Sequence, residues 1–476
     1  MKIIEKKPAL GLIVATRGFF NPQLAGEGRK YLLAKMEELG YDYVIPQESA
    51  TPNGAIETLA DARKCAALFQ ENRNKIDGII VILPNFGDEL GVVQTIDLAG
   101  LNVPVLVQAC DDELGKLDVK SRRDAFCGKL SVCNNLYQYG IPFTDTAQHT
   151  VKINSDEFSR DIDSFARVCR VVRGLKRARI GAIGARPAAF QTVRFSEKLL
   201  QASGITVVPV DLSEIISAAQ SLDGEAATVR AKVNQIRDYG FIPERIPAEH
   251  VLRQAKFSVA IDNWMERNEL DASAVQCWTS IQENYGCATC LSMSLMGEEL
   301  MPSACEVDVA GAVSMYALLL ASGRAPGFLD WNNNYGDDRE KCICVHCSNF
   351  PKSFIGGEVE ISQLDVLGES LGKEKCFGAV KGKVAAGPMT YFRLTTDDTR
   401  GIISAYVGEG AFTDDPADID GGVAVCQVSN LRSLLGFICR NGFEHHVAMT
   451  RSHCAAVLHE AVSRYLKWET YFHPKA

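Results

Sequence analysis

Two carboxylates stand two residues apart in the segment 304–309, which reads ACEVDV. The apolar run after it predicts a helix over 310–321 that ends at Gly323. If the residues beside the carboxylates face the core, Glu306 and Asp308 point together to the opposite side. The pair could then bind a metal or exchange protons. The alternative is a solvated acidic turn.

A third carboxylate, Asp330, lies at the end of an apolar run in the segment 328–335 (FLDWNNNY). Amides and rings follow it, and loops of this kind often hold sugars or metals. We therefore expect a loop in which Asp330 serves a site and Asn332 contacts a substrate. The alternative is a turn whose Asn side chains cap the backbone.

The segment 342–347 (CICVHC) allows two interpretations. Its cysteines and histidine could bind zinc, but structural zinc usually needs a second pair of ligands. The other close pair, Cys287 and Cys290, lies more than 50 residues upstream. The alternation also fits a strand in which His346 faces a site and the cysteines pack in the core. We favour the strand.

Two adjacent histidines, His445 and His446, end the segment 442–446 (GFEHH). On an extended chain they point to opposite sides, so only one of them can easily face a given site. The alternative is a pair of surface histidines near a turn. Together, the four segments supply carboxylates and imidazoles. Such a mixed oxygen and nitrogen set suits Mn²⁺, Co²⁺, Fe²⁺ or Zn²⁺ better than Ca²⁺.

The first half of the chain alternates apolar runs with helical patterns, as expected for parallel sheets with helices on both faces. The predicted strands of the first pass are 9–16, 41–45, 76–84 and 103–109, with helices over 24–39 and 57–73. A second pass begins near residue 179, with strands at 179–185, 205–211 and 256–262 and a helix over 190–203. After residue 326, Gly-rich β patterns replace the helical ones.

These patterns predict an α/β protein of three domains. Residues 1–173 and 174–325 are expected to form two Rossmann-like (flavodoxin-like) domains with parallel sheets. Residues 326–476 are expected to form a β-rich, antiparallel, barrel-like domain. The central domain carries Glu306, and the C-terminal domain carries Asp330 and the histidines of the motifs.

Two arginines follow predicted strands at the edge where α/β sheets bind ligands: Arg17 in the first domain and Arg186 in the second. Either could bind a phosphate. Neither lies in a Walker loop or a complete G-x-G-x-x-G motif, which argues against a nucleotide.

Composition excludes several classes of protein. The net charge of −9 argues against nucleic-acid binding, which needs a basic face. No segment reaches the roughly 18 apolar residues of a membrane span. The apolar run 9–16 is followed by Arg17 without a cleavage site, so we interpret it as a buried strand rather than a signal peptide. The 16 cysteines are then expected to be free thiols in the cytoplasm.

The order of the motifs, CEVDV, helix, FLDWNN, VHCSN and EHH, resembles that of the L-fucose isomerase and L-arabinose isomerase superfamily. The resemblance covers the whole chain. It implies metal ligation by Glu306, Asp330 and His446, the second histidine of the pair. His346 matches a ligand of the arabinose-type members that the fucose-type members lack.

The resemblance also implies an activity, the interconversion of an aldose and a ketose with Mn²⁺, or with Co²⁺, Fe²⁺ or Zn²⁺. The metal would stabilise a cis-enediolate, with Glu306 and Asp330 as base and acid. His445 would bind a sugar hydroxyl, and Trp278 would stack on the sugar unless it packs in the core. A homo-oligomer such as a hexamer is implied, with active sites at subunit interfaces and Arg17 contacting the substrate of a neighbour.

Arg17 and Arg186 add an expectation beyond the family. A neutral sugar needs few cations, whereas arginine suits sulfonates and phosphates. We therefore expect a sugar with an anionic tail, such as a sulfo-sugar. Two other functions stay open: a non-catalytic two-lobed sugar-binding protein, and a metal-dependent aldolase or hydrolase with the same ligands.

Overall fold

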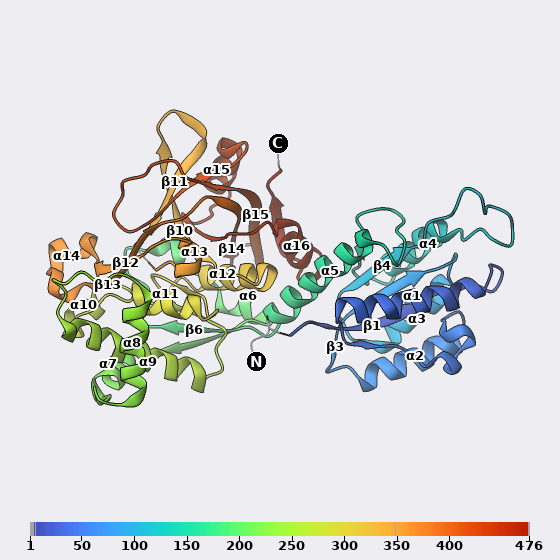
Figure 1. The fold of residues 1–476 in the computed structure, drawn as a ribbon, viewed down its shortest axis with the longest axis horizontal. Helices are drawn as coiled ribbons and strands as arrows, with labels where there is room; N and C mark the ends of the chain where they lie inside the picture. The colour runs from blue at the N-terminus through green and yellow to red at the C-terminus, as the bar shows by residue number, and fades with distance from the viewer. Residues whose placement is uncertain (1–3, 5, 348, 475–476) are drawn as a thin grey trace. The chain divides into compact units, whose positions relative to one another are not determined.

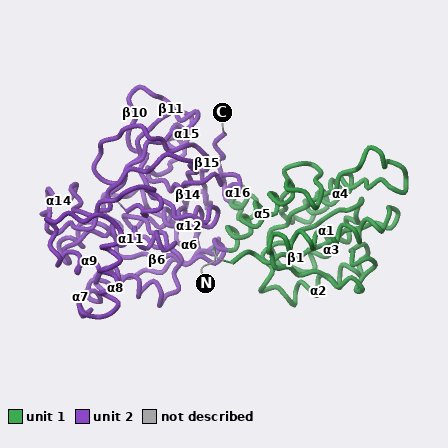
Figure 2. Tube along the Cα trace, viewed as in Figure 1, with its two compact units in different colours: residues 1–173, 460–467 green, residues 174–459, 468–476 purple. Residues whose placement is uncertain are grey.

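The computed structural model describes residue 4 and residues 6–347 and 349–474 of the chain (Figure 1). The chain divides into two compact units. Unit 1 comprises Met1–Arg173 and Glu460–Lys467, and unit 2 comprises Gly174–His459 and Trp468–Ala476 (Figure 2). Among the described helices, none combines the length and the apolar character needed to cross a membrane.

Unit 1 is built on a five-stranded parallel sheet with the order β2-β1-β3-β4-β5. Every residue of β1 and β3 is buried, as expected for apolar strands covered on both faces. The strands are β1 (Ala9–Val14), β2 (Tyr43–Val44), β3 (Ile76–Leu83), β4 (Val105–Ala109) and β5 (Thr144–Asp145). The helices are α1 (Gln23–Leu39), α2 (Leu59–Glu71), α3 (Glu89–Ala99), α4 (Ala125–Gln138) and α5 (Asp156–Leu175).

Unit 2 begins with a second parallel sheet, of order β7-β6-β8-β9. Its strands are β6 (Arg179–Ile183), β7 (Thr206–Val210), β8 (Ala272–Val275) and β9 (Ser303–Ala304). The helices of this part are α6 (Glu197–Ala202), α7 (Leu212–Ser221), α8 (Ala227–Tyr239), α9 (Ala248–Arg267), α10 (Ser280–Asn284), α11 (Cys290–Glu298) and α12 (Val309–Ser322). The α/β class with parallel sheets is confirmed.

The predicted strand 256–262 is wrong, because these residues lie inside α9. The buried residues of α9 recur at helical spacing, for example Val251, Ala255, Ser258 and Ile261. A short apolar run looks the same in a buried strand and in a buried helix, and the wider spacing decides between them.

The remainder of unit 2 forms a nine-stranded mixed sheet of order β12-β13-β16-β11-β10-β17-β14-β15-β18. Its first strands are β10 (Gly327–Tyr335), β11 (Asp338–His346), β12 (Glu360–Gln363) and β13 (Phe377–Lys383). They are followed by β14 (Gly387–Asp397), β15 (Ile402–Thr413), β16 (Gly422–Gln427), β17 (His446–Thr450) and β18 (Glu469–Phe472). The helices here are α13 (Lys352–Ile355), α14 (Asp365–Leu371), α15 (Leu431–Arg440) and α16 (Ala455–His459).

The region is β-rich, as predicted, but it is neither wholly antiparallel nor closed as a barrel. β13 pairs with β16 and β15 pairs with β18 in parallel. The pairing of β15 with β16 joins β16, β11, β10, β17, β14 and β15 in a ring, but β12, β13 and β18 lie outside it. The nine-stranded sheet as a whole therefore keeps two edge strands, which a fully closed barrel does not have. Gly-rich alternation predicts strands without revealing which of them pair.

Helix α12 links the two sheets of unit 2. It packs against β8 and β9 of the parallel sheet and against β14 and β17 of the mixed sheet. Its residues from Val309 to Ala321 are all buried, as expected for a helix that is apolar all round. The turn that enters α12 therefore delivers Glu306 and Asp308 into the interior.

Candidate metal centre and active site

Three neighbouring strands place three of the predicted ligands side by side. In the order β11-β10-β17, His346 ends β11, Asp330 lies in β10 and His446 begins β17. Asp330 is directly opposite His446 in the ladder. The segment 328–335 is thus part of a strand, not the predicted loop. Glu306 reaches the same place from the turn between β9 and α12.

Two buried carboxylate oxygens face the Nε2 atoms of two histidines. Glu306 Oε2 lies 3.6 Å from His346 Nε2 and 3.7 Å from His446 Nε2. Asp330 Oδ1 lies 3.5 Å from His446 Nε2 and 4.0 Å from His346 Nε2. Neither oxygen has a hydrogen-bond partner within the described part of the chain. Buried polar atoms are rarely left unpaired, so these two indicate a cationic partner.

The geometry of these four residues fits a divalent metal. Bonds of about 2.1 Å from a metal to nitrogen or oxygen place neighbouring donor atoms about 3.0–3.4 Å apart and opposite ones about 4.2 Å apart. The observed separations of 3.5, 3.6, 3.7 and 4.0 Å fall between the spacing of neighbours and that of opposite ligands. Glu306, His346 and His446 also form one compact group of candidate ligand atoms.

A chain of buried charges holds His446 in place. Its Nδ1 lies 2.8 Å from Asp308 Oδ2, and Asp308 accepts two hydrogen bonds from Arg393, at 2.6 and 3.1 Å. Arg393 in turn donates to Glu444 at 3.0 Å. Burial alone would raise the pKa of Asp308, but Arg393 and His446 hold it well below its usual range. Asp308 therefore stays ionised and keeps the proton on Nδ1, which leaves Nε2 free to bind a metal.

Glu306 is held by its other oxygen. Trp278 Nε1 donates to Glu306 Oε1 at 3.3 Å, and the Cys277 thiol donates to it at 3.4 Å. Burial raises the pKa of Glu306. Glu306 and Val307 both have φ near +55°, a left-handed conformation that is rare for a β-branched residue and is often found at functional sites. Trp278, predicted as a sugar contact, thus also positions a carboxylate.

A ring that the sequence did not reveal lies beside the histidines. The Phe190 ring is 5.3 Å from Trp278, 5.9 Å from His445 and 6.2 Å from His446 between centroids. His445 is 43% exposed at its side chain, and its Nε2 lies 3.8 Å from Asp330 Oδ1. The expectation that the two histidines point to opposite sides is wrong: their ring centroids lie 4.4 Å apart, and His446 Nε2 is likewise 3.5 Å from Asp330 Oδ1. They differ in burial instead, because His446 is buried and His445 is exposed.

The side chains of two other predicted substrate contacts, Arg186 and Asn332, make no hydrogen bond or ion pair to the candidate metal ligands among the residues that the structure describes. Arg186 shares the loop after β6 with Phe190, but its Nη1 donates to Pro187 O at 2.9 Å within that loop. Asn332 is exposed on β10 and lines a groove with His445.

Arg17 lies in unit 1, after β1, whereas the candidate ligands lie in unit 2. Its guanidinium stands 4.5 Å over the Phe86 ring, 3.5 Å from Asp88 and 3.7 Å from Glu89. Two carboxylates therefore already offset its charge.

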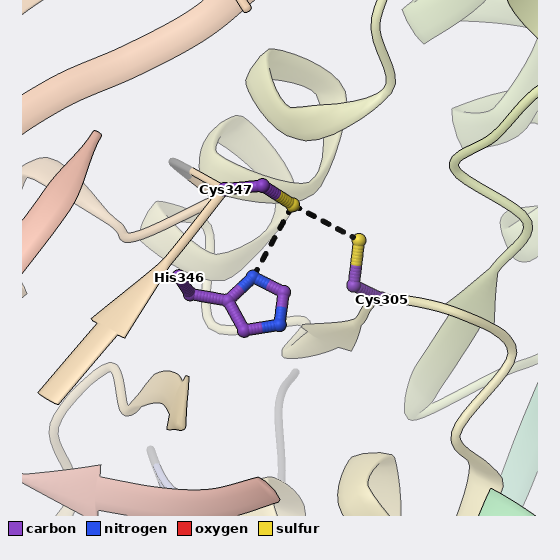
Figure 3. Close-up of side chains that lie close together, drawn as sticks. All are labelled: Cys305, His346 and Cys347. Atoms are coloured by element: carbon purple, nitrogen blue, oxygen red, sulfur yellow. Dashed lines mark hydrogen bonds between the residues drawn. The ribbon is translucent and has the colours of Figure 1, made fainter. Parts of the chain in front are cut away.

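His346 is held on its far side by sulfur. Its Nδ1 lies 3.3 Å from Cys347 Sγ, which lies 3.6 Å from Cys305 Sγ (Figure 3). Burial alone would lower the pKa of His346, but Cys347, Asp330 and Glu306 raise it to about 10. In β11, Cys342, Cys344 and His346 are all buried and alternate with less buried residues, as the strand interpretation predicts.

Comparison with known protein families identifies both ends of the chain. Residues 11–176 match the fucose/sulfoquinovose isomerase N-terminal domain, and residues 344–473 match the L-fucose isomerase C-terminal domain. The chain belongs to the L-fucose isomerase-like superfamily. The second match includes His346 and His446, whereas Glu306 and Asp330 lie in residues 177–343, between the two matches.

Curated relatives extend the comparison with this superfamily. A sulfoquinovose isomerase from Priestia aryabhattai is 25% identical over 389 residues, covering 79% of this chain and 81% of the relative. One from Alkalicoccus urumqiensis is 25% identical over 403 residues, covering 81% of this chain and 84% of the relative. One from Clostridium sp. (strain MSTE9) is 28% identical over 181 residues, covering 38% of each chain.

The superfamily match identifies this chain as an enzyme, a sugar isomerase. A non-catalytic two-lobed sugar-binding protein is not favoured. The sequence pointed to Glu306, Asp330, His346 and His446, and the structure brings all four together. The sequence analysis did not identify Arg393 and Glu444 as part of the site. A lone arginine inside the apolar run MTYFRL is nevertheless a signal for a buried ion pair.

Proposed function

We propose that this isomerase converts a sulfonated aldose of the sulfoquinovose type into its ketose, using a divalent metal. The observation that carries the proposal is the pair of unpartnered buried oxygens, Glu306 Oε2 and Asp330 Oδ1, that face two histidine nitrogens. The relatives named sulfoquinovose isomerase support the substrate class.

The proposed metal ligands are Glu306, Asp330, His346 and His446. Their oxygen and nitrogen donors suit Mn²⁺ foremost, with Co²⁺, Fe²⁺ or Zn²⁺ as alternatives. When bound, the ion would act as a Lewis acid that stabilises negative charge on the two reacting oxygens of the sugar.

The protein would then move the protons. Isomerisation transfers one proton between C1 and C2 and another between the two oxygens. Glu306 and Asp330 are the proposed base and acid. Burial raises the pKa of Glu306 above its usual range, which makes it easier for the carboxylate to take up a proton. Asp308 and Arg393 would keep His446 fixed during this exchange.

Positive charge for a sulfonate is available close to this site. A groove of about 910 Å³ contains Asn332 and His445 among its lining residues. The same groove is lined by four cationic side chains: Arg339, Lys341, Arg432 and Arg440. Lys341 is already paired with Asp415 at 2.8 Å, so the arginines supply most of the available charge. We propose these cations as the binding site for the anionic tail, with Arg17 and Arg186 as the alternative.

We propose a homo-hexamer with active sites at subunit interfaces on the basis of the resemblance. A cytoplasmic location is proposed from the cysteine pattern, and domain boundaries at 173/174 and 325/326 from the sequence patterns. The mass of the enzyme by light scattering tests the hexamer.

NMR in D₂O tests the reaction. With Mn²⁺ and sulfoquinovose, we expect an aldose–ketose mixture, deuterium at C1 or C2, and no cleavage of carbon–carbon bonds. A chelator should abolish turnover and Mn²⁺ should restore it. Glu306→Gln should remove turnover while the protein stays folded, and Glu358→Gln, at an exposed carboxylate, should not. Normal turnover by Glu306→Gln would overturn the site.

Kinetics on paired substrates test the anionic tail. Arg432→Ala combined with Arg440→Ala should raise KM for the sulfonated sugar and leave KM for its neutral 6-hydroxy analogue unchanged. Arg17→Ala is the parallel variant for the alternative. If the neutral sugar is the better substrate of the unmodified enzyme, the isomerase stands and the sulfonate proposal fails.

A further inference from the structure

Four cysteines from four separate segments converge beside the candidate metal centre. Cys347 Sγ lies 3.6 Å from Cys305 Sγ and 4.0 Å from Cys290 Sγ. Cys277 lies beside Cys305 and Glu306 in a neighbouring compact group. Three of these cysteines follow strands, namely β8, β9 and β11, and Cys290 begins α11. Parallel strands end at one edge of their sheet, which explains why Cys277 and Cys305 meet there.

His346 lies between this thiol cluster and the candidate metal centre. Its Nε2 faces the orphaned oxygens of Glu306 and Asp330, and its Nδ1 lies 3.3 Å from Cys347 Sγ. Figure 3 shows Cys347 within reach of both the ring nitrogen and the Cys305 sulfur. The imidazole therefore offers one nitrogen to an oxygen-rich set of donors and the other to a sulfur-rich set.

The sulfur-rich set has the spacing of a soft-metal site. Zinc bonds of about 2.3 Å to sulfur and about 2.1 Å to nitrogen place tetrahedral donors about 3.6–3.8 Å apart. Cys347 Sγ lies 3.3 Å from His346 Nδ1 and 3.6 Å from Cys305 Sγ, close to this spacing. Cys305, His346 and Cys347 also form one compact group of candidate ligand atoms. Thiolates select thiophilic ions such as Zn²⁺, Cd²⁺ and Cu⁺ over Mn²⁺.

The zinc that the CICVHC motif suggested would have used a different set of cysteines. Cys342 and Cys344 lie 3.9 Å apart in the core beneath β11 and do not join the cluster at Cys347. Only the last two residues of the motif, His346 and Cys347, reach the thiol cluster. The partners from β9 and α11 are 42 and 57 residues away in sequence, which is why spacing alone could not find them.

We propose a second cation site, formed by Cys305, Cys347 and Nδ1 of His346, that binds a thiophilic ion such as Zn²⁺ or Cd²⁺. Cys290 lies beside it, 4.0 Å from Cys347 Sγ. Binding releases the thiol protons to solvent as metal–sulfur bonds form. Because His346 also belongs to the oxygen-rich set, filling the second site changes a ligand of the first. A thiophilic ion should therefore inhibit the Mn²⁺-loaded enzyme, and excess Mn²⁺ should not relieve this. The predicted inhibition rests on the proposed function, whereas the thiol site is inferred from its geometry alone.

Cadmium absorbance tests the site without measuring turnover. The Mn²⁺-loaded enzyme, kept reduced with a phosphine, is titrated with Cd²⁺ while the ultraviolet charge-transfer band of cadmium–thiolate bonds is followed. We expect saturation at one Cd²⁺ per chain and loss of the band in Cys305→Ser and Cys347→Ser. Cys342→Ser, which changes the separate buried pair of Cys342 and Cys344, should keep the absorbance band. A band that survives in both cluster variants, or that is lost in Cys342→Ser instead, overturns the proposal.

X-ray absorption at the zinc edge gives a second test on the unmodified chain. With one equivalent of Zn²⁺ added to the Mn²⁺-loaded enzyme, we expect about two sulfur neighbours and one nitrogen from the protein. A shell of nitrogen and oxygen alone overturns the proposal. A sulfur shell without isomerase activity on any sugar would leave the second site standing and refute the proposed function, so the two failures are distinguishable.

Discussion

Asp308 joins three structural elements through one carboxylate. It accepts the Gly311 backbone N–H at 2.8 Å and so caps α12, it pairs with Arg393, and it holds the Nδ1 of His446. Arg393 is fully buried and has Glu444 as its second acid. A buried charge is tolerated when every partner is present, so the chain of acids and arginine acts as one unit.

Asp308→Asn should affect both metal binding and the stability of the fold, and the two effects can be measured separately. The neutral amide would no longer fix the proton on His446 Nδ1, and outer partners of this kind affect metal affinity by about 10- to 100-fold. We expect Mn²⁺ affinity to fall by that factor and the free energy of unfolding to fall by about 3 kcal/mol, because Arg393 loses one acid. Activity as a function of Mn²⁺ concentration and denaturant unfolding measure the two effects.

Glu444→Gln is the matched control. It also removes an acid from Arg393 but leaves the Asp308–His446 contact intact. The stability loss should be similar, with Mn²⁺ affinity nearly unchanged. Equal losses of affinity in both variants would show that His446 is not oriented through Asp308.

Glu306 should make the metal-free protein less stable as pH rises. Its pKa in the folded state is raised above 4.5 by burial. Above that pH the unfolded chain ionises while folded Glu306 keeps its proton, so stability falls until pH passes the raised pKa. Metal-free Glu306→Gln should therefore melt at a higher temperature than the unmodified chain at neutral pH, and the difference should vanish in acid. Melting curves across this range check the sign, which would be reversed for a carboxylate with a lowered pKa.

At the residue scale, the sequence revealed the groups whose chemistry is visible in their type. Glu306, Asp330 and the two ligand histidines stand out because carboxylates and imidazoles interrupt apolar segments. Arg393, Cys347 and Phe190 owe their roles to neighbours from other segments. No local pattern encodes such partners, because they depend on how strands pair.

The packing of α12 against β10 is the element that most directly supports the histidines. A Cβ on Gly311 would lie 2.5 Å from the ring of Phe328. That ring is 4.7 Å from His446 and 5.5 Å from His346 between centroids. The absence of a side chain at Gly311 therefore allows the helix to approach the ring that backs both imidazoles.

Two glycine substitutions in helices should have opposite effects. Gly311→Ala should destabilise by about 1–3 kcal/mol through overpacking and lower kcat by displacing Phe328. Gly26→Ala in α1, where a Cβ would meet nothing within 4 Å, should stabilise by about 0.5–1 kcal/mol through reduced chain entropy. Thermal unfolding and steady-state kinetics on both variants check this. A stabilised, fully active Gly311→Ala would contradict the packing argument.

At the element scale, periodicity predicted α12 and the strand that carries His346, because their apolar patterns are long or strictly alternating. It failed for residues 256–262, a short apolar run, and for residues 328–335, whose polar half resembles a loop. In β10 the polar residues lie beyond the buried start of the strand, at the exposed hairpin with β11. Exposure changes along a strand, and composition alone does not show where.

For the whole molecule, metal binding should stabilise one unit and not the other. All proposed ligands lie in unit 2, so Mn²⁺ at 100 times its Kd should stabilise that unit by about 2.7 kcal/mol. Hydrogen exchange with and without chelator should show the change in peptides that cover β9 to β11 and β17. Protection gained only in unit 1 would place the metal elsewhere.

Unit 1 is assembled from two parts of the chain. Residues 460–467, which include the π-helical turn Glu460–Tyr465, belong to it together with Met1–Arg173. The Tyr465 hydroxyl bonds to Thr144 at 2.7 Å and donates to Val105 O at 3.2 Å, which ties this turn to the edge of the sheet. On the ribosome, the sheet emerges first, but this turn follows only after residues 174–459 have been translated. Residues 1–173 must therefore wait without the turn that contacts Val105 and Thr144. This edge of the sheet is where a chaperone would be expected to bind the nascent chain.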